Sequence, residues 1–406
     1  MAENVVNANN SMKPVYWLAV GMFGIGTESF MIVPLLPRMS ADLSVPLVDV
    51  GVLVTVFTLT LALSSPILTT LLGNLNRRKL LIIALAAFAL ANGFAWASSN
   101  YWQLLMARIL LALSAGLYTP NANALAGSIV PPAKRGRAIS IVNTGLTIAV
   151  AFGLPLGSLV GLTFGWRMTF LGVGLISLLA IVGLLVGIHS KAGDHMKVAS
   201  LRDRLQVAGQ PNILIVLVIT LTWAAGAYVL WTYFAPYLNQ TIGASGGEIS
   251  AAVFLWGISA AAGVILGGHL SDRFGHRAVM VPLLSLLLLT LLIFSGSALF
   301  LTQREAIVPV GISVFLWGIA GWGFYPAQLS RLVGLAGHAH APIALSLNHS
   351  FMYLGFSIGA SVGSLVMLHA SVADLGWLGA IFEVVALLLL LSTTRRETSS
   401  TIAQNP

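Results

Sequence analysis

Four ionisable residues lie deep inside apolar segments of this sequence: Glu28, Arg108, His349 and Glu383. A charged group in hydrocarbon costs several kcal/mol, so such residues are the first candidates for function in a membrane protein. Glu28 follows two glycines and precedes Pro34 and Pro37. A low-dielectric setting disfavours the charged carboxylate, so this group can load and release a proton. The alternative is a structural carboxyl bonded to a neighbouring helix.

Arg108 stands in the fourth apolar run, ahead of a small-residue patch. An arginine keeps its proton at working pH, so in this position it requires a partner. The sequence leaves two roles open for Arg108, proton coupling and a packing clamp on backbone carbonyls.

His349 lies between Asn348 and Ser350, so three consecutive polar residues interrupt the eleventh apolar run. Asn348 and His349 are candidates for lining a solute cavity, and interhelical hydrogen bonding explains them equally well. Glu383 lies in the last run. A snorkelling or interhelical carboxyl is the simpler interpretation of Glu383.

Aromatic residues concentrate in the second half of the chain, often beside glycines. Trp and Tyr commonly form belts at membrane interfaces, but those near mid-helix can stack on a planar solute. The candidates for solute stacking are Trp231, Tyr233, Trp317 and Tyr325. Asn121, Asn123 and Asn143 are candidates for hydrogen bonds to a polar solute, with helix-to-helix bonding as the alternative.

The composition predicts that most of the chain lies in a membrane. The sequence is 57% apolar and 8% charged, with a mean hydropathy of +0.93. Twelve apolar runs of roughly 17 to 25 residues or more are interrupted midway by a polar stretch, Ser190–Pro211, in which residues 201–207 could form a short amphipathic helix. The predicted layout is six spans, a linker and six spans. The apolar run after residue 14 lacks a cleavage pattern and is expected to stay as the first span.

The basic residues predict the orientation of these spans. Of the 20 Lys and Arg residues, sixteen fall on the side of the termini, three fall on the other side, and Arg108 lies within a span. Because cytoplasmic loops are enriched in Lys and Arg, both termini are predicted to be cytoplasmic. The net charge of +8 is spread over small groups between spans, which indicates membrane topology and no nucleic-acid partner.

The loop Gly268–Arg277 joins two predicted spans and contains Asp272, Arg273 and Arg277. It resembles the Gly-x-Leu-x-Asp-Arg-x-Gly-Arg-Arg signature of the major facilitator superfamily of secondary transporters, with His276 in place of the first basic residue of the final pair. The resemblance implies that these three residues act at a cytoplasmic gate. The corresponding first-half segment, residues 70–79, includes Arg78 but has Gly73 or Asn74 where the family has an acid.

The resemblance covers nearly the whole chain and implies an all-α integral membrane fold. It predicts two pseudo-symmetric six-helix bundles, residues 1–189 and 212–406, joined by a cytoplasmic linker at 190–211. The likeness is greatest to the proton-antiporter branch that exports drugs, sugars and nucleosides, including multidrug resistance proteins. The runs that carry it are 23–37, 131–138, 165–170, 230–237 and 317–326.

Two further features bear on the direction and coupling of transport. The fifth run carries Gly145, Gly153, Pro155, Gly157 and Gly161, which loosely resemble the antiporters' glycine-proline signature, although Leu154 and Pro155 replace its Gly-Pro pair. The resemblance also implicates the fourth-helix arginine, here Arg108, in proton transfer. The sequence therefore favours proton-coupled export across the cytoplasmic (inner) membrane, and leaves an importer, a uniporter or a non-transporting solute sensor as alternatives.

Enzymatic activity is not expected. The run from Gly359 to Gly363 matches a hydrolase Gly-x-Ser-x-Gly elbow, but it falls inside an apolar helix and not at a strand-to-helix turn. The sequence has no cysteine and shows no phosphate-binding loop or metal-ligand cluster, so no cofactor or metal is predicted. The expected partners are a small-molecule substrate, protons and the lipid bilayer. We expect a monomer to be functional, although the sequence leaves the oligomeric state open.

Overall fold

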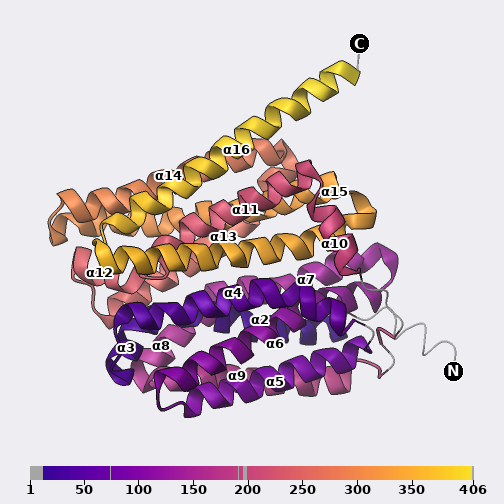
Figure 1. Cartoon of the computed structure of the whole chain (residues 1–406), viewed down its shortest axis with the longest axis horizontal. Coiled ribbons are helices and arrows are strands. Elements are labelled where there is room, and N and C mark those ends of the chain that lie inside the picture. Colours follow the sequence, from indigo (N-terminus) through magenta and orange to yellow (C-terminus); the bar gives the residue numbers. More distant parts are fainter. Residues whose placement is uncertain (1–11, 74, 191, 195–198, 405–406) are drawn as a thin grey trace. The chain divides into compact units, whose positions relative to one another are not determined.

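The computed structural model describes residues 12–73, 75–190, 192–194 and 199–404, and these residues form helices and turns (Figure 1). Twelve of the helical segments are long and apolar enough to cross a membrane. The twelve predicted spans and the all-α membrane fold are therefore confirmed, and the chain is a multi-pass membrane protein.

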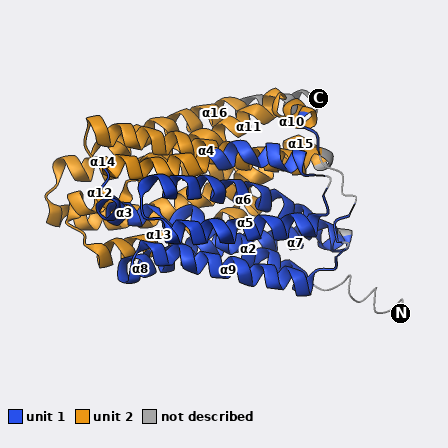
Figure 2. Cartoon of the chain, turned by 60° about the horizontal axis from the view of Figure 1, so that its bottom comes forward, with its two compact units in different colours: residues 1–45, 60–201 blue, residues 46–59, 202–406 orange. Residues whose placement is uncertain are grey.

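The described chain forms two compact units (Figure 2). Unit 1 comprises residues 1–45 and 60–201, and unit 2 comprises residues 46–59 and 202–406. The helix α4 (Leu47–Leu71) contributes its first half to unit 2 and its second half to unit 1.

The other elements of unit 1 are α2 (Lys13–Met31), η1 (Val33–Leu35), α3 (Leu36–Leu43), α5 (Arg77–Ala97), α6 (Tyr101–Ser128), η2 (Pro132–Lys134), α7 (Arg135–Ile148), η3 (Ala149–Gly153), α8 (Leu154–Phe164) and α9 (Trp166–Gly187). The first span is thus broken after Met31 into a 3₁₀ turn that contains Pro34 and a second helix that contains Pro37. Each of these prolines lacks the backbone N–H that a continuous helix would use, which favours a break here.

The fifth span packs closely on the first. A Cβ atom built on Gly145 would lie 2.2 Å from the carbonyl oxygen of Ala19, and one on Gly153 would lie 2.1 Å from Thr27 Oγ1. Only glycine permits this approach. Gly153 ends η3, a π-helical segment within the span, and such segments are frequent at functional sites.

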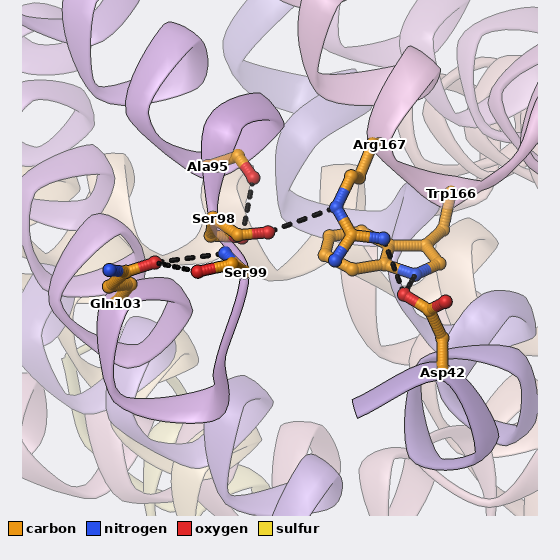
Figure 3. A network of polar contacts seen from close by, with 7 residues as sticks. All are labelled: Asp42, Ala95, Ser98, Ser99, Gln103, Trp166 and Arg167. Atoms are coloured by element: carbon orange, nitrogen blue, oxygen red, sulfur yellow. Dashed lines mark hydrogen bonds and ion pairs between the residues drawn. The ribbon is translucent and has the colours of Figure 1, made fainter. Parts of the chain in front are cut away.

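One end of unit 1 is fixed by a polar network around Arg167 (Figure 3). Arg167 forms an ion pair with Asp42 and donates to the Ser98 carbonyl at 2.9 Å. Its guanidinium carbon lies 4.2 Å from the centre of the Trp166 ring, and Trp166 donates to Asp42 at 3.1 Å. The ends of α3, α5 and α9 are therefore held together.

The remaining elements of unit 2 are α10 (Leu201–Ala208), α11 (Pro211–Trp231), α12 (Phe234–Ile242), α13 (Gly246–Phe274), α14 (His276–Phe300), α15 (Gln303–His369) and α16 (Asp374–Gln404). The long helix α15 contains two spans, 303–337 and 340–369, separated at Gly337, where φ is +68°. The second span packs on α11 through Gly355, Gly359 and Gly363, at each of which a Cβ atom would lie within 2.7 Å of an α11 carbonyl oxygen. The Gly-x-Ser-x-Gly run thus serves helix packing.

The linker forms the predicted short helix, α10. Its Arg204 is buried and donates to Ser346 Oγ at 2.9 Å, and this burial lowers the pKa of the guanidinium below its ordinary value. Val207 of α10 joins an apolar cluster with α11 and α15. The linker helix therefore belongs to the packed structure of unit 2.

Candidate functional site

The centre of unit 1 contains an ion pair between Glu28 of α2 and Arg108 of α6. Both side chains have no exposed surface. Glu28 lies one turn before the break in the first span, and Tyr118 of α6 donates to the carbonyl of Leu18 on α2 at 2.9 Å. Two of the four ionisable residues that lie within apolar runs are thus partners. The sequence alone did not indicate this pairing.

Two buried oxygen atoms beside the ion pair lack hydrogen-bond partners among the described residues. Glu28 Oε2 accepts no hydrogen bond from the described residues, and neither does the buried Thr27 Oγ1 beside it. Because an ion pair in a low-dielectric interior is not screened by water, each charge here depends strongly on the other. Protonation of Glu28 would remove one of the two charges.

The predicted asparagines of unit 1 differ in their settings. Asn121 is buried, accepts from Arg77 Nη1 at 2.7 Å and donates to the Leu117 carbonyl at 2.6 Å. Asn143 is exposed and accepts from Asn123 at 3.4 Å. Asn121 therefore holds a buried guanidinium, while the face of Asn143 is open for other contacts.

The predicted gate residues also differ. Asp272, Arg273 and Arg277 are exposed at the α13–α14 turn, and Asp272 makes no ion pair within the described residues. Arg78 instead donates to the carbonyls of Leu184 and Leu185 at 3.2 and 2.8 Å. It thus caps the end of α9, where a cation is favoured. Of the two positions considered for the missing acid, Gly73 lies in the turn after α4 and residue 74 lies outside the described residues.

Trp231 and Trp317 pack in an aromatic cluster of unit 2. The Trp231 ring stacks on Trp256 with centroids 4.0 Å apart and meets Trp317 edge-on at 5.7 Å. Phe234 and Phe294 complete the cluster. Tyr233, two residues after Trp231, is also buried. Its hydroxyl and that of Ser364 share a 2.8 Å hydrogen bond.

Tyr325 belongs to a second aromatic group. Its ring is stacked on Trp223 at 5.8 Å and meets Trp322 edge-on at 6.2 Å. Trp223 is buried, and its Nε1 has no hydrogen-bond partner among the described residues. Tyr325 itself is only partly buried, so of the four aromatic candidates it is the one with accessible surface.

A buried cluster of neutral polar side chains lies in the same unit. Thr220 Oγ1 donates to Asn348 Oδ1 at 2.7 Å, and Gln328 Nε2 donates to Thr220 Oγ1 at 3.0 Å. All three residues are fully buried. Asn348 Nδ2 and Gln328 Oε1 have no partner among the described residues. Sequence reasoning singled out Asn348 but missed Thr220 and Gln328, although a glutamine within an apolar run was an available signal.

His349 points to a different set of neighbours. Its ring centroid lies 4.8 Å from that of Tyr353, and Tyr353 in turn contacts Phe356 at 5.3 Å. Phe356 is stacked on Tyr228 at 3.8 Å. His349 and Asn348 thus contact different residues, as expected for consecutive helical positions.

The described residues contain no group of three or more His, Cys, Asp or Glu side chains that could hold a metal ion. Glu383, the fourth ionisable residue within a span, is fully buried, and neither of its oxygens has a hydrogen-bond partner in the described part of the chain.

These features agree with the comparison to known protein families. The model of the Major Facilitator Superfamily matches residues 18–360 and 216–406. The chain therefore belongs to the Major Facilitator Superfamily and is a membrane transporter, not an enzyme. The resemblance of its α13–α14 turn to the family signature is thereby explained.

Among its relatives are two bacterial transporters of similar length. The uncharacterized MFS-type transporter YbcL of Bacillus subtilis is 30% identical, over 94% of this chain and 96% of that protein. The inner membrane transport protein YdhP of Escherichia coli is 30% identical, over 97% of this chain and 98% of that protein.

Solved structures support the fold. A bacterial homolog of the human lysosomal transporter Spinster, inward-facing and occupied, has a TM-score of 0.73 at 17% identity and covers 94% of this chain and 96% of its own. A point mutant of the nucleoside transporter NupG has a TM-score of 0.70 at 14% identity, over 94% and 99% of the two chains. At such identities the likeness extends to the fold alone.

Proposed function

We propose that this transporter is a proton-coupled antiporter that exports a small organic solute, such as a drug, a nucleoside or nucleobase, or a sugar. It would work by alternating access in the cytoplasmic (inner) membrane, with both termini cytoplasmic and residues 1–189 and 212–406 as its moving halves. The observation that carries the proposal is the fully buried ion pair of Glu28 and Arg108.

The pair gives protons a direct effect on the helices of unit 1. When Glu28 is ionised, its charge is balanced by Arg108, which joins α2 to α6. When Glu28 is protonated, Arg108 keeps its charge but loses the counter-ion, so its most stable position changes. The 3₁₀ break after Met31 lies one turn from Glu28 and supplies a point at which α2 can move.

The contact of the fifth span with α2 supports an antiporter. The glycines that loosely resemble the antiporter signature are the residues that allow this contact, and Gly153 meets Thr27, the neighbour of Glu28. A movement of α2 on protonation of Glu28 would therefore be transmitted to η3 through this contact.

We propose that the solute contacts a group of neutral and aromatic side chains in unit 2. Tyr325 and Trp223 offer aromatic faces, and the donor atom Asn348 Nδ2 and the acceptor atom Gln328 Oε1 have no hydrogen-bond partner among the described residues. His349, Asn143 and Asn121 remain proposed polar contacts. Trp231, Tyr233 and Trp317 remain proposed solute contacts too, and their close packing means that the solute would have to displace part of their cluster.

We propose that the cytoplasmic gate involves both the turn Gly268–Arg277 and the first-half segment 70–79. Asp272, Arg273 and Arg277 are exposed and can exchange partners during a transport cycle. Arg78 is already bonded to two carbonyls at the end of α9, so its part in a gate would be to position α5 against α9. We also propose that the monomer is the functional form.

The test is transport into proteoliposomes under an imposed pH gradient. The probes are labelled uridine and adenosine, labelled hexoses, and the planar cation ethidium. An antiporter accumulates its solute when the lumen is acidic, whatever the orientation of the inserted protein, because protons leave as solute enters. Glu28→Gln should abolish this accumulation, and Lys13→Gln, which changes a charge at the start of α2, is the matched control.

Other outcomes separate the alternatives. Accumulation only with an acidic exterior indicates a proton-coupled importer, and equilibration that ignores the gradient indicates a uniporter. Binding of a probe without entry in any condition favours a solute sensor. Accumulation by Glu28→Gln at the wild-type level would remove Glu28 from the coupling mechanism.

A further inference from the structure

Glu383 is a buried carboxyl that the proposed mechanism does not use. It lies in the middle of the last span, 374–393, and has no exposed surface. Neither Oε1 nor Oε2 accepts a hydrogen bond from the described residues. A carboxylate in such a place has lost its water and gained no donor in return.

The carboxyl is pressed against the backbone of another helix. A Cβ atom built on Gly226 of α11 would lie 2.5 Å from Glu383 Oε1 and 2.7 Å from the Gly379 carbonyl oxygen. A Cβ atom built on Gly379 would in turn lie 2.6 Å from the Gly226 carbonyl oxygen. The two glycines therefore let α11 and α16 meet backbone to backbone, and Glu383 lies one turn beyond that crossing.

No described cation is placed to balance a charge on Glu383. The helix α11 has no Asp, Glu, Lys, Arg or His, and its Tyr228 is stacked on Phe356. On α14, Leu291 and Ser295 lie beside the glycines of α16, Gly376 and Gly379. His276 and Arg277 lie at the opposite end of α14.

The charged groups of α15 and α16 are also directed elsewhere. On α15, Arg331 donates to Thr393, about 15 Å along α16 from Glu383, and His349 packs on Tyr353. Asp374, at the start of α16, accepts from Trp377 and Ser371.

We propose that Glu383 is a second proton-binding site of the transporter, which holds its proton while α11 and α16 are packed at Gly226 and Gly379. A protonated carboxyl is neutral and becomes a donor. The carbonyl oxygens on both sides of the glycine crossing are suitable acceptors, since each has a second lone pair. Loss of the proton requires water or a cation to reach the carboxyl, and this requires the two helices to separate.

The site differs from that of Glu28 in chemistry and in place. Glu28 is balanced by Arg108 within unit 1, whereas Glu383 has no hydrogen-bond partner and no ion pair among the described residues of unit 2. The proposal of a second proton site therefore does not depend on the proposed antiport mechanism. An experiment can reject either proposal without rejecting the other.

The test uses the purified full chain in detergent as wild type, Glu383→Gln, Glu28→Gln and Glu383→Asp. Infrared spectra in H₂O and D₂O report the carbonyl stretch of a protonated carboxyl. We expect a deuterium-sensitive band at neutral pH that Glu383→Gln removes and Glu28→Gln retains. Unfolding temperatures from about pH 5 to 9 should show wild type losing stability relative to Glu383→Gln as the pH rises, since only the wild type has a proton to lose there.

Three results would overturn the proposal. The first is an unchanged carboxyl band in Glu383→Gln, and the second is a difference in unfolding temperature that does not vary with pH. The third is a Glu383→Gln protein that does not fold while Glu383→Asp does, because glutamine matches the size and neutrality of the protonated acid.

Discussion

The two units balance their buried polar groups in different ways. Unit 1 uses charge: Glu28 is paired with Arg108, and the buried Arg77 is bonded to Asn121. Unit 2 also buries Arg204 and Arg331, each of which donates to a hydroxyl group. It differs in its neutral hydrogen-bonded cluster of Thr220, Gln328 and Asn348, and in Glu383, which has no hydrogen-bond partner among the described residues. A charged pair depends on both members, whereas a neutral cluster tolerates the loss of one bond.

From this difference we infer separate functions for the two units. An ion pair in a low-dielectric interior responds strongly to one proton, which suits coupling. A neutral cluster beside aromatic rings can exchange its hydrogen bonds for those of an uncharged solute at little cost. The proposed division places coupling in unit 1 and the aromatic solute contacts in unit 2.

Arg108→Met should be the most damaging single substitution, since it leaves the Glu28 carboxylate buried without a counter-ion. We expect a loss of about 3–5 kcal/mol in unfolding free energy near neutral pH. The loss should shrink as the pH falls, because a protonated Glu28 needs no counter-ion. Denaturant unfolding in detergent at several pH values measures both effects.

The control for this substitution is the double variant Glu28→Gln, Arg108→Met, which contains no buried charge at this site. It should recover most of the lost stability. A double variant as unstable as Arg108→Met would show that the methionine fits poorly, and that the ion pair is not the cause.

Gly153→Val tests the contact between η3 and α2. Its Cβ would lie 2.1 Å from Thr27 Oγ1, so the helices must shift, at a cost of about 1–3 kcal/mol. Gly172→Ala, at a helical glycine whose Cβ would meet nothing within 4 Å, is the control and should be neutral or slightly stabilising. Equal unfolding temperatures for Gly153→Val and wild type would show that this contact is not tight.

Thr220→Val removes the hydroxyl at the centre of the unit 2 cluster while keeping its shape. We expect a loss of about 1–2 kcal/mol, and this loss should not depend on pH, because no charge is involved. A clear pH dependence, measured as for Arg108, would show that the cluster contains or contacts an ionised group and would break the contrast between the units.

Glu383→Gln should change the unfolding free energy by less than about 1 kcal/mol at acidic pH. The glutamine replaces a neutral group by a neutral group of the same size. A loss at acidic pH as large as that of Arg108→Met would show that Glu383 is an ionised, partnered carboxylate like Glu28.

The fold was accessible from the sequence because a lipid environment leaves so few solutions. Twelve long apolar runs can only be helices when every backbone group must be bonded internally, and the turn at Gly268–Arg277 resembles a family signature. Glu28 and Arg108 could be singled out for the same reason, since charges are rare in spans.

The partners of these residues could not be predicted. Glu28 and Arg108 are 80 residues apart in sequence, and helical periodicity does not say which faces of α2 and α6 meet. The same applies to Trp231 and Trp317, whose mutual packing follows from the crossing of α11 and α15, and to Gln328, whose role depends on Thr220 of another helix. A sequence shows which residues need partners, and tertiary packing selects them.

The coupling role of Glu28 is tested most directly by solute-induced proton release from the purified transporter in weakly buffered detergent. A probe first shown to be transported is added to wild type, Glu28→Gln and Glu383→Gln, and the change in pH is recorded. Release from wild type and Glu383→Gln, with none from Glu28→Gln, is the predicted result. Equal release from wild type and Glu28→Gln would show that the coupled proton resides elsewhere and that Glu28 does not couple transport to protons.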